Sequence, residues 1–225
     1  MKRIALMIAL MGAALPAMAD EIQRQITVTG EGTVQMAPDM AVISLGVTHQ
    51  DKDAARAMAR ASGAAADVLE RLSTMGIAAR DVQTSSVTLS PIYTRRKDAG
   101  PMEIEGFRAG LSMSVRVRDL PKLGAVLGAV VQDGANQFSG LQFALSQPQE
   151  AQDAARKDAV ADALRKAGLY AQAAGASLGD VLQISENGGY SAPKMRMAAD
   201  MAESVPIAEG ELNISQSVTL VIELK

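Results

Sequence analysis

The chain has 225 residues, no cysteine, one histidine and a formal net charge of −3. A mildly acidic chain without clusters of Lys and Arg is a poor partner for nucleic acid, whose phosphates must be neutralised by basic side chains. The cysteine and histidine counts exclude disulfides and leave too few ligands for a zinc or iron site of the usual kind.

The first 19 residues have the three parts of a secretory signal peptide. Lys2 and Arg3 form a basic start, residues 4–15 are apolar, and residues 17–19 (Ala-Met-Ala) form a small-x-small cleavage motif. The alternative is a short membrane anchor, but the apolar run falls short of the ~20 residues that a spanning helix needs, and no later stretch reaches that length. We therefore predict cleavage after Ala19 and an exported mature chain without a transmembrane helix. Loss of Lys2 and Arg3 changes the net charge from −3 to −5.

Two strands and a long helix are predicted after this leader. Residues 26–36 alternate in polarity, with a bulge or sharp bend at the Gly-Glu-Gly of 30–32, and residues 41–48 alternate with one more apolar face. Asp53 is a suitable N-cap for a helix over 54–75, because its carboxylate can accept hydrogen bonds from free backbone amides. The apolar stripe of this helix consists mostly of small side chains, so the helix can lie close to the element that it covers.

The rest of the chain continues with strand and helix patterns. A strand over 82–93 precedes one over 107–117, whose strict alternation favours an antiparallel sheet with one face in water. The remaining predicted elements are a short helix over 120–132, a strand over 138–146, a long helix over 149–174, and strands over 178–187 and 212–224. The core stripe of the second long helix is predicted as Ala155, Ala159, Val160, Ala163, Leu164, Ala167, Ala171 and Ala174.

An internal repeat connects the two long helices. The Asp-Ala-Ala-Arg at 53–56 recurs at 153–156, and the glycine that ends each helix, Gly76 or Gly175, is followed by an Asp-Val pair five residues later. In each copy a strand precedes the helix and two strands follow it. We therefore predict an α+β fold with two α/β lobes, each a long Ala-rich helix on mainly antiparallel strands. Lobes at 26–132 and 137–225 are one division consistent with this repeat.

Seven stretches spread over the mature chain carry a resemblance to a known family. They are ITVTGEG at 26–32, DVQTSSVTLSPIY at 81–93, VRDLPKLGAVL at 117–127, DGANQFSGLQFALSQP at 133–148, ARKDAVADALRKA at 155–167, GASLGDVLQISE at 175–186 and VPIAEGE at 205–211. In this order the set resembles the SIMPL-domain family of bacterial envelope proteins. We therefore expect residues 20–225 to form one SIMPL-type domain.

The resemblance implies a function without implying a reaction. Members of the family are typically periplasmic; some are immunogenic surface-associated antigens, some are linked to oxidative-stress tolerance, and at least one forms a ring-shaped oligomer. The resemblance implies a non-enzymatic homo-oligomer in envelope maintenance or oxidative-stress tolerance, with the outer membrane or other envelope proteins as candidate partners. The family has no established catalytic residue, so no catalytic, cofactor-binding or metal-binding residue is carried over.

The residues themselves offer little catalytic chemistry. His49 precedes Asp51 and Asp53 and could form a base or a ligand with them, but a strand end beside a helix cap is the simpler interpretation. The Gly-Glu-Gly at 30–32 lacks the rest of a phosphate-binding loop. The strands also contain serines, none of them on a Gly-x-Ser-x-Gly turn: Ser85, Ser86, Ser90 and Ser114. We expect no enzymatic activity.

Two further groups of side chains have a functional and a structural interpretation. Met195, Met197 and Met201 lie in a predicted loop over 188–208 and could scavenge oxidant or hold Cu(I), or could simply pack on a neighbouring subunit. A copper-binding or small-ligand module is therefore the alternative function. The second group shares one strand face and is either a solvated surface or a charged subunit interface: Arg108, Arg116 and Arg118.

Overall fold

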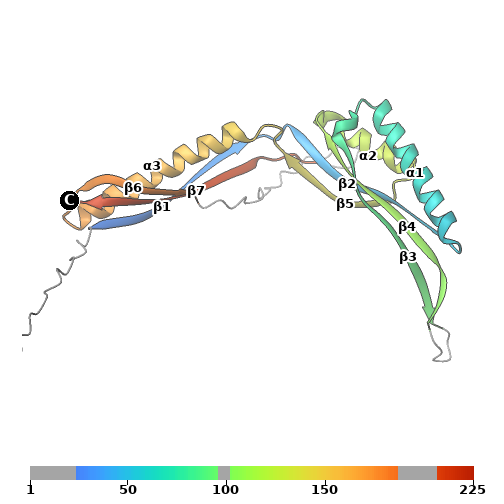
Figure 1. The fold of residues 1–225 in the computed structure, drawn as a ribbon. Helices are drawn as coiled ribbons and strands as arrows, with labels where there is room; N and C mark the ends of the chain where they lie inside the picture. The colour runs from blue at the N-terminus through green and yellow to red at the C-terminus, as the bar shows by residue number, and fades with distance from the viewer. Residues whose placement is uncertain (1–23, 96–101, 187–206) are drawn as a thin grey trace, which may run out of the picture.

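The computed structural model describes residues 24–95, 102–186 and 207–225. It confirms the predicted α+β class, because two antiparallel sheets are each covered by helices on one face. The two sheets follow one another along an elongated molecule (Figure 1). The predicted signal peptide at 1–19 lies outside the described residues, so its cleavage stays a prediction.

The first sheet has the strand order β1-β7-β6 and carries one long helix, α3. The bounds of these elements are β1 Gln25–Met36, β7 Leu212–Leu224, β6 Leu178–Glu186 and α3 Gln149–Ala173. The helix lies along β1 and β7 (Figure 1) and buries the alternate apolar residues of these strands, including Val28, Leu220 and Ile222. We call this half of the molecule the α3 lobe.

The second sheet has the strand order β3-β4-β2-β5 and carries α1 and α2 on one face. The bounds are β2 Met40–Asp51, α1 Ala54–Thr74, β3 Val82–Arg95, β4 Met102–Val117, α2 Leu123–Gln132 and β5 Gln137–Ala144. Asp53 caps α1 as predicted, since its carboxylate accepts a hydrogen bond from the Arg56 amide at 2.9 Å. Ile43, Leu45, Val68 and Met113 contribute to the main core between this sheet and its helices, in what we call the α1 lobe.

The internal repeat exists in space but not along one continuous stretch of chain. Around α3 the order β6-β7-β1 corresponds to the order β3-β4-β2 around α1. The strand that directly precedes α3 in the sequence, β5, pairs with β2 in the other sheet, and β1 takes the corresponding place. The strands are therefore not divided between the sheets at 26–132 and 137–225. Sequence periodicity identifies a strand but does not determine its long-range partner, which is why this division could not be read from the repeat.

Two chain segments connect the lobes, one between β1 and β2 and one between β5 and α3, and they are hydrogen-bonded to each other at Asp39. The Asp39 amide donates to the Ala144 carbonyl at 3.2 Å, and the Asp39 carboxylate accepts from the amide and the hydroxyl of Ser146 at 2.7 and 2.6 Å. Leu212, the first residue of β7, is buried in the core of the α1 lobe although most of β7 belongs to the other sheet. Bonds and packing therefore both connect the two lobes.

The Gly-Glu-Gly at 30–32 brings α3 against the backbone of β1. The predicted bulge is wrong, because the pairing of β1 with β7 runs without a shift from Gly30 opposite Val218 to Gly32 opposite Gln216. A Cβ atom at Gly30 would lie 2.0 Å from the Ala159 carbonyl oxygen, and one at Gly32 would lie 2.0 Å from the Ala155 carbonyl oxygen. These glycines are therefore required for close approach of two backbones rather than for a bend.

The buried face of α3 is narrower than the predicted stripe. It consists of alanines at every fourth position: Ala151, Ala155, Ala159, Ala163, Ala167 and Ala171. Leu164, predicted in the core, is 41 % exposed, and Ala174 is also exposed. The reason is the close approach at Gly30, which leaves room between helix and strand for a row of methyl groups only and places larger apolar side chains on the flank of the helix.

Candidate functional site

The single histidine does not meet a serine or a metal ligand set. His49 lies on β2 opposite Ala109, and its Nε2 atom is buried without a hydrogen-bond partner. Leu89 lies across Ala109 on β3, so the neighbouring Ser90 belongs to the opposite face of the sheet. Ser114 pairs with Ser44, five positions along β2 from His49 and also on that opposite face. In the part of the chain that the structure describes, no group of three or more His, Cys, Asp or Glu side chains could hold a metal ion.

The three arginines predicted to share a strand face have different environments. Arg118 binds Asp81 through two hydrogen bonds of 2.8 and 2.9 Å, whereas Arg108 and Arg116 lie exposed on β4. Asp81 is only 6 % exposed, and the hydrogen bond from Arg118 keeps its pKa below the usual value for an aspartate. Sequence reasoning missed the role of Asp81, although its place in the repeated Asp-Val pair was a usable signal. Whether the exposed arginines form a subunit interface stays a prediction.

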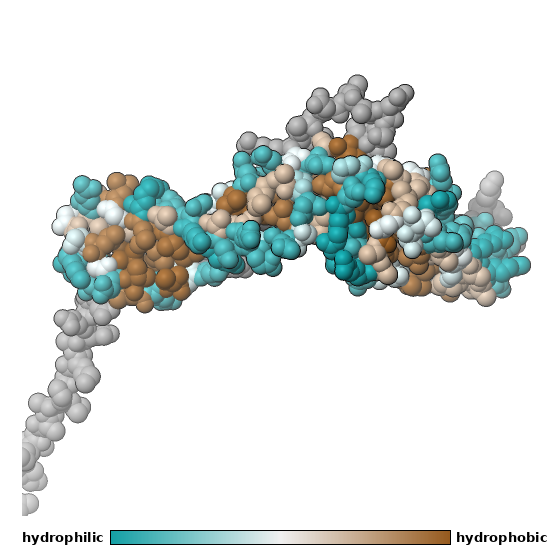
Figure 2. All heavy atoms as spheres, turned by 90° about the horizontal axis from the view of Figure 1, so that it is seen from above, coloured by the Kyte–Doolittle hydropathy of each residue, from teal (hydrophilic) through white to brown (hydrophobic). Residues whose placement is uncertain are grey.

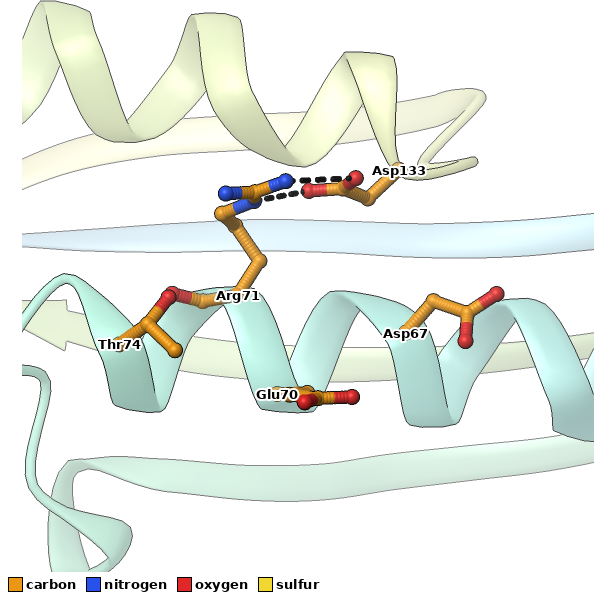
Figure 3. Close-up of a pocket in the computed structure, with 5 residues that line it drawn as sticks. All are labelled: Asp67, Glu70, Arg71, Thr74 and Asp133. Atoms are coloured by element: carbon orange, nitrogen blue, oxygen red, sulfur yellow. Dashed lines mark hydrogen bonds and ion pairs between the residues drawn. The ribbon is translucent and has the colours of Figure 1, made fainter.

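A polar pocket lies between α1 and the end of α2 (Figure 3). Arg71 and Asp133 point toward one another and form an ion pair, with the Arg71 Nη2 atom 3.2 Å from the Asp133 Oδ1 atom. This contact raises the pKa of Arg71 and lowers that of Asp133. The carboxylates of Asp67 and Glu70 turn away from the pair, so the acidic groups do not converge on one point. The ion pair therefore connects the two helices, and we interpret the pocket as a structural feature of this contact.

The methionines suggested as a Cu(I) site lie outside the residues that the structure describes. Met195, Met197 and Met201 fall within 187–206, outside the described residues. Binding of Cu(I) by this group therefore stays a prediction.

The edge strand β6 presents apolar side chains that α3 does not cover. Ile184 pairs with Leu220, which is buried under α3, so Ile184 points to the same face of the sheet, yet it is 63 % exposed. The helix reaches this strand through an ion pair between Arg156 and Glu186 at 2.9 Å. Val181 and Leu182 are also exposed, at an irregularity in the pairing with β7. We call Val181, Leu182 and Ile184 the β6 face.

The corresponding edge strand of the α1 lobe, β3, is uncovered in the same way. Val87 pairs with Leu111 and Leu89 with Ala109; both partners pack under α1, but Val87 is 58 % exposed. Farther along the hairpin, Tyr93 pairs with Ile104, and both side chains are exposed. Figure 1 shows that this end of the β3–β4 hairpin extends beyond α1. We call Val87, Leu89, Tyr93 and Ile104 the β3 face.

These two faces form the strongest candidate for a functional surface. Hydrophobic residues gather along the α3 lobe on the side shown in Figure 2. Exposed apolar groups beside an edge strand, with its unpaired backbone N–H and C=O groups, are typical of surfaces that bind another protein. The sequence signal was the run of apolar residues at 181, 182 and 184, which is denser than the alternation expected for a strand with one covered face.

Comparison with known proteins identifies one family over most of the chain. The family model described as "SIMPL: Protein of unknown function (DUF541)" matches residues 26–222. In the described residues, no helix is both long and apolar enough to cross a membrane.

Several curated proteins resemble the chain along most of its length. The 26 kDa periplasmic immunogenic proteins of Brucella melitensis and Brucella abortus are each 39 % identical to it, over 97 % of this chain and 94 % of theirs. The uncharacterized protein YggE of Escherichia coli K12 is 27 % identical over 90 % of this chain and 83 % of its own. These names describe a location and an immune response, or no property at all, and none of them describes a reaction.

Proposed function

Since the chain belongs to the SIMPL family, whose described function is unknown, we propose that it is a non-enzymatic periplasmic protein that acts as a homo-oligomer in the maintenance of the cell envelope. The observation that carries the proposal is the pair of uncovered apolar faces, one on β3 and one on β6. The predicted signal peptide and the word "periplasmic" in the names of the Brucella relatives support the location. Tolerance of oxidative stress is the specific role that we propose to test.

Self-association through these faces follows from their composition and position. Burial of apolar surface contributes about 25 cal/mol per Å2, so large exposed aliphatic side chains favour association when a complementary surface is present. The β3 and β6 faces occupy equivalent places in the repeat but differ in sequence. Contact of the β6 face of one copy with the β3 face of the next would be heterologous, and heterologous contacts produce a closed ring or an open chain.

A lysine in either face should prevent this association. We expect Ile184→Lys and Val87→Lys each to convert the mature protein to monomer, because a buried ammonium without a partner is strongly unfavourable. Both side chains are exposed, so the fold should be retained and circular dichroism should be unchanged. Multi-angle light scattering after size-exclusion chromatography measures the mass, and Val131→Lys on α2, also at an exposed valine, is the matched control.

Mixing the two lysine variants tests the heterologous arrangement. The Ile184→Lys variant keeps its β3 face and the Val87→Lys variant keeps its β6 face, so the mixture should form a dimer and nothing larger. Pairing of like faces instead predicts that the two variants remain separate or form homodimers. A wild-type chain that is monomeric at micromolar concentration would contradict the proposal itself.

Loss of the gene should increase sensitivity to hydrogen peroxide, and complementation can separate assembly from catalysis. We expect the wild type and a His49→Ala variant to restore growth, while Ile184→Lys does not, because the proposed role requires the oligomer and does not require the His49 side chain. Growth on peroxide plates with equal amounts of each protein in the periplasmic fraction is the measurement. Failure of His49→Ala at equal protein level would instead favour an enzyme.

A further inference from the structure

A cleft in the α1 lobe, separate from both apolar faces, lies where β4 ends. Its cavity volume is about 270 Å3, near the lower end of the ~300–1,000 Å3 that is typical of small-molecule sites. The cleft is formed by the end of α1, the turn before β3 and the segment between β4 and α2. Its size suits a small molecule rather than a polypeptide.

The walls of the cleft have an excess of positive charge. Four cationic side chains and two anionic ones line it: Arg80, Arg116, Arg118, Lys122, Asp81 and Asp119. Arg118 is paired with Asp81 at 2.8 Å and Lys122 with Asp119 at 2.8 Å. Within 24–95, 102–186 and 207–225, no salt bridge engages Arg80 or Arg116. Two guanidinium groups are thus available to an anion in a chain whose net charge is −3.

The buried carboxylate of Asp81 fixes the geometry of this charge. Its two hydrogen bonds orient the Arg118 guanidinium, and Arg80 and Arg116 are close enough to help lower the pKa of the same carboxyl. All three arginines line the same cleft, and Asp81 forms its ion pair with Arg118. A guanidinium presents its N–H groups in a planar fork that matches the oxygens of carboxylate and phosphate.

The cleft also has an apolar side, formed by Met75, Ile77 and Val126. Val126 is buried in the main core, and Met75 and Ile77 pack against that core. An apolar wall next to unpaired cations is the arrangement expected for a ligand with a charged end and a hydrocarbon end.

We propose that this cleft binds a small organic oxyanion, with Arg80 and Arg116 holding a phosphate or carboxylate group and the partly buried Met75 and Ile77 contacting a short apolar chain. Arg118 and its partner Asp81 act as positioning residues. The proposal is independent of self-association, since neither apolar face contributes to the cleft.

Isothermal titration of the mature protein with hexyl phosphate at low ionic strength tests the site. We expect measurable binding, weaker binding of inorganic phosphate, and no detectable binding of hexanol. Arg80→Gln and Arg116→Gln should each weaken hexyl phosphate binding by about tenfold, the effect of losing one charge-assisted contact. Both side chains are exposed and unpaired in the described structure, so these variants should fold normally, which thermal unfolding checks. The matched control is Arg108→Gln, an exposed arginine on the same strand and outside the cleft, which should leave the affinity unchanged.

Two results of the titration would overturn the proposal, and a vesicle assay distinguishes the two sources of the oxyanion. No heat with hexyl phosphate at millimolar concentration, or an equal loss in the Arg108→Gln control, would overturn the proposal. Sedimentation with vesicles that contain phosphatidylglycerol identifies the source of the oxyanion. Vesicle binding that is lost in Arg116→Gln assigns it to a lipid headgroup, and titration heat without vesicle binding assigns it to a soluble molecule.

Discussion

Replacement of Gly30 by alanine is expected to destabilise the α3 lobe by about 3 kcal/mol or more, although alanine is the smallest possible addition. The new methyl group would lie 2.0 Å from the Ala159 carbonyl oxygen and 2.4 Å from the Ala163 amide nitrogen. Both are backbone atoms, so no side chain can rotate away and the whole helix must move outward. Such a movement separates the row of buried alanines from Val28 and Leu220, and the core of this lobe loses its contacts.

Urea unfolding followed by circular dichroism at 222 nm measures this effect. Gly168→Ala is the matched control, because Gly168 lies in the same α3 helix and a Cβ atom there meets nothing within 4 Å. That control should stabilise the lobe by up to about 1 kcal/mol, the difference in helix propensity between glycine and alanine. Equal urea midpoints for Gly30→Ala and the wild type would show that α3 does not contact β1 in solution.

Gly30 also shows why the fold class could be predicted when the packing could not. The alternation of the strands, the cap at Asp53 and the alanine-rich helices are local patterns, and each of them predicted its element. A glycine pair inside a strand is compatible with a bulge and with a close approach, and only the position of α3 distinguishes the two. The same close approach explains why Leu164 is exposed: helical periodicity indicates a wide apolar stripe, but the strand backbone selects one row of it.

The candidate surfaces were harder to predict for a related reason. The apolar residues of β3 and β6 resemble core residues in sequence, since a strand pattern does not reveal how many strands a helix covers. In both lobes the long helix lies over two strands and leaves the next strand, β3 or β6, exposed. Val87 and Ile184 therefore follow a core pattern in the sequence, but the sheet topology places them on the surface. The proposed assembly uses these exposed apolar side chains.

Replacement of Asp81 by asparagine should cost roughly 2 kcal/mol of unfolding free energy at pH 7, the typical value of hydrogen bonds to a charged group. The carboxylate is 6 % exposed, but the side chain of Arg118 is 48 % exposed and remains hydrated, so the loss should stay below that for a fully buried ion pair. Asparagine has nearly the same shape, so the loss should be electrostatic. Chemical denaturation at pH 7 measures it, and Asp119→Asn, next to the same cleft but in an exposed pair with Lys122, should change little.

The pH dependence of the Asp81→Asn effect separates charge from packing. The pKa of Asp81 in the folded protein is lower than its ordinary value of 3.8, chiefly because Arg118 donates hydrogen bonds to the charged form. A carboxyl group with a lowered folded pKa stabilises the protein above its unfolded pKa, and this contribution is lost as the pH falls through the folded value. The difference between wild type and Asp81→Asn should therefore be constant from pH 7 to about pH 5 and should shrink as the pH falls below about 4. A difference that persists undiminished at pH 3 would mean that the effect does not come from the charge of the Asp81 carboxylate, and the argument that this charge orients Arg118 beside the proposed oxyanion site would be wrong.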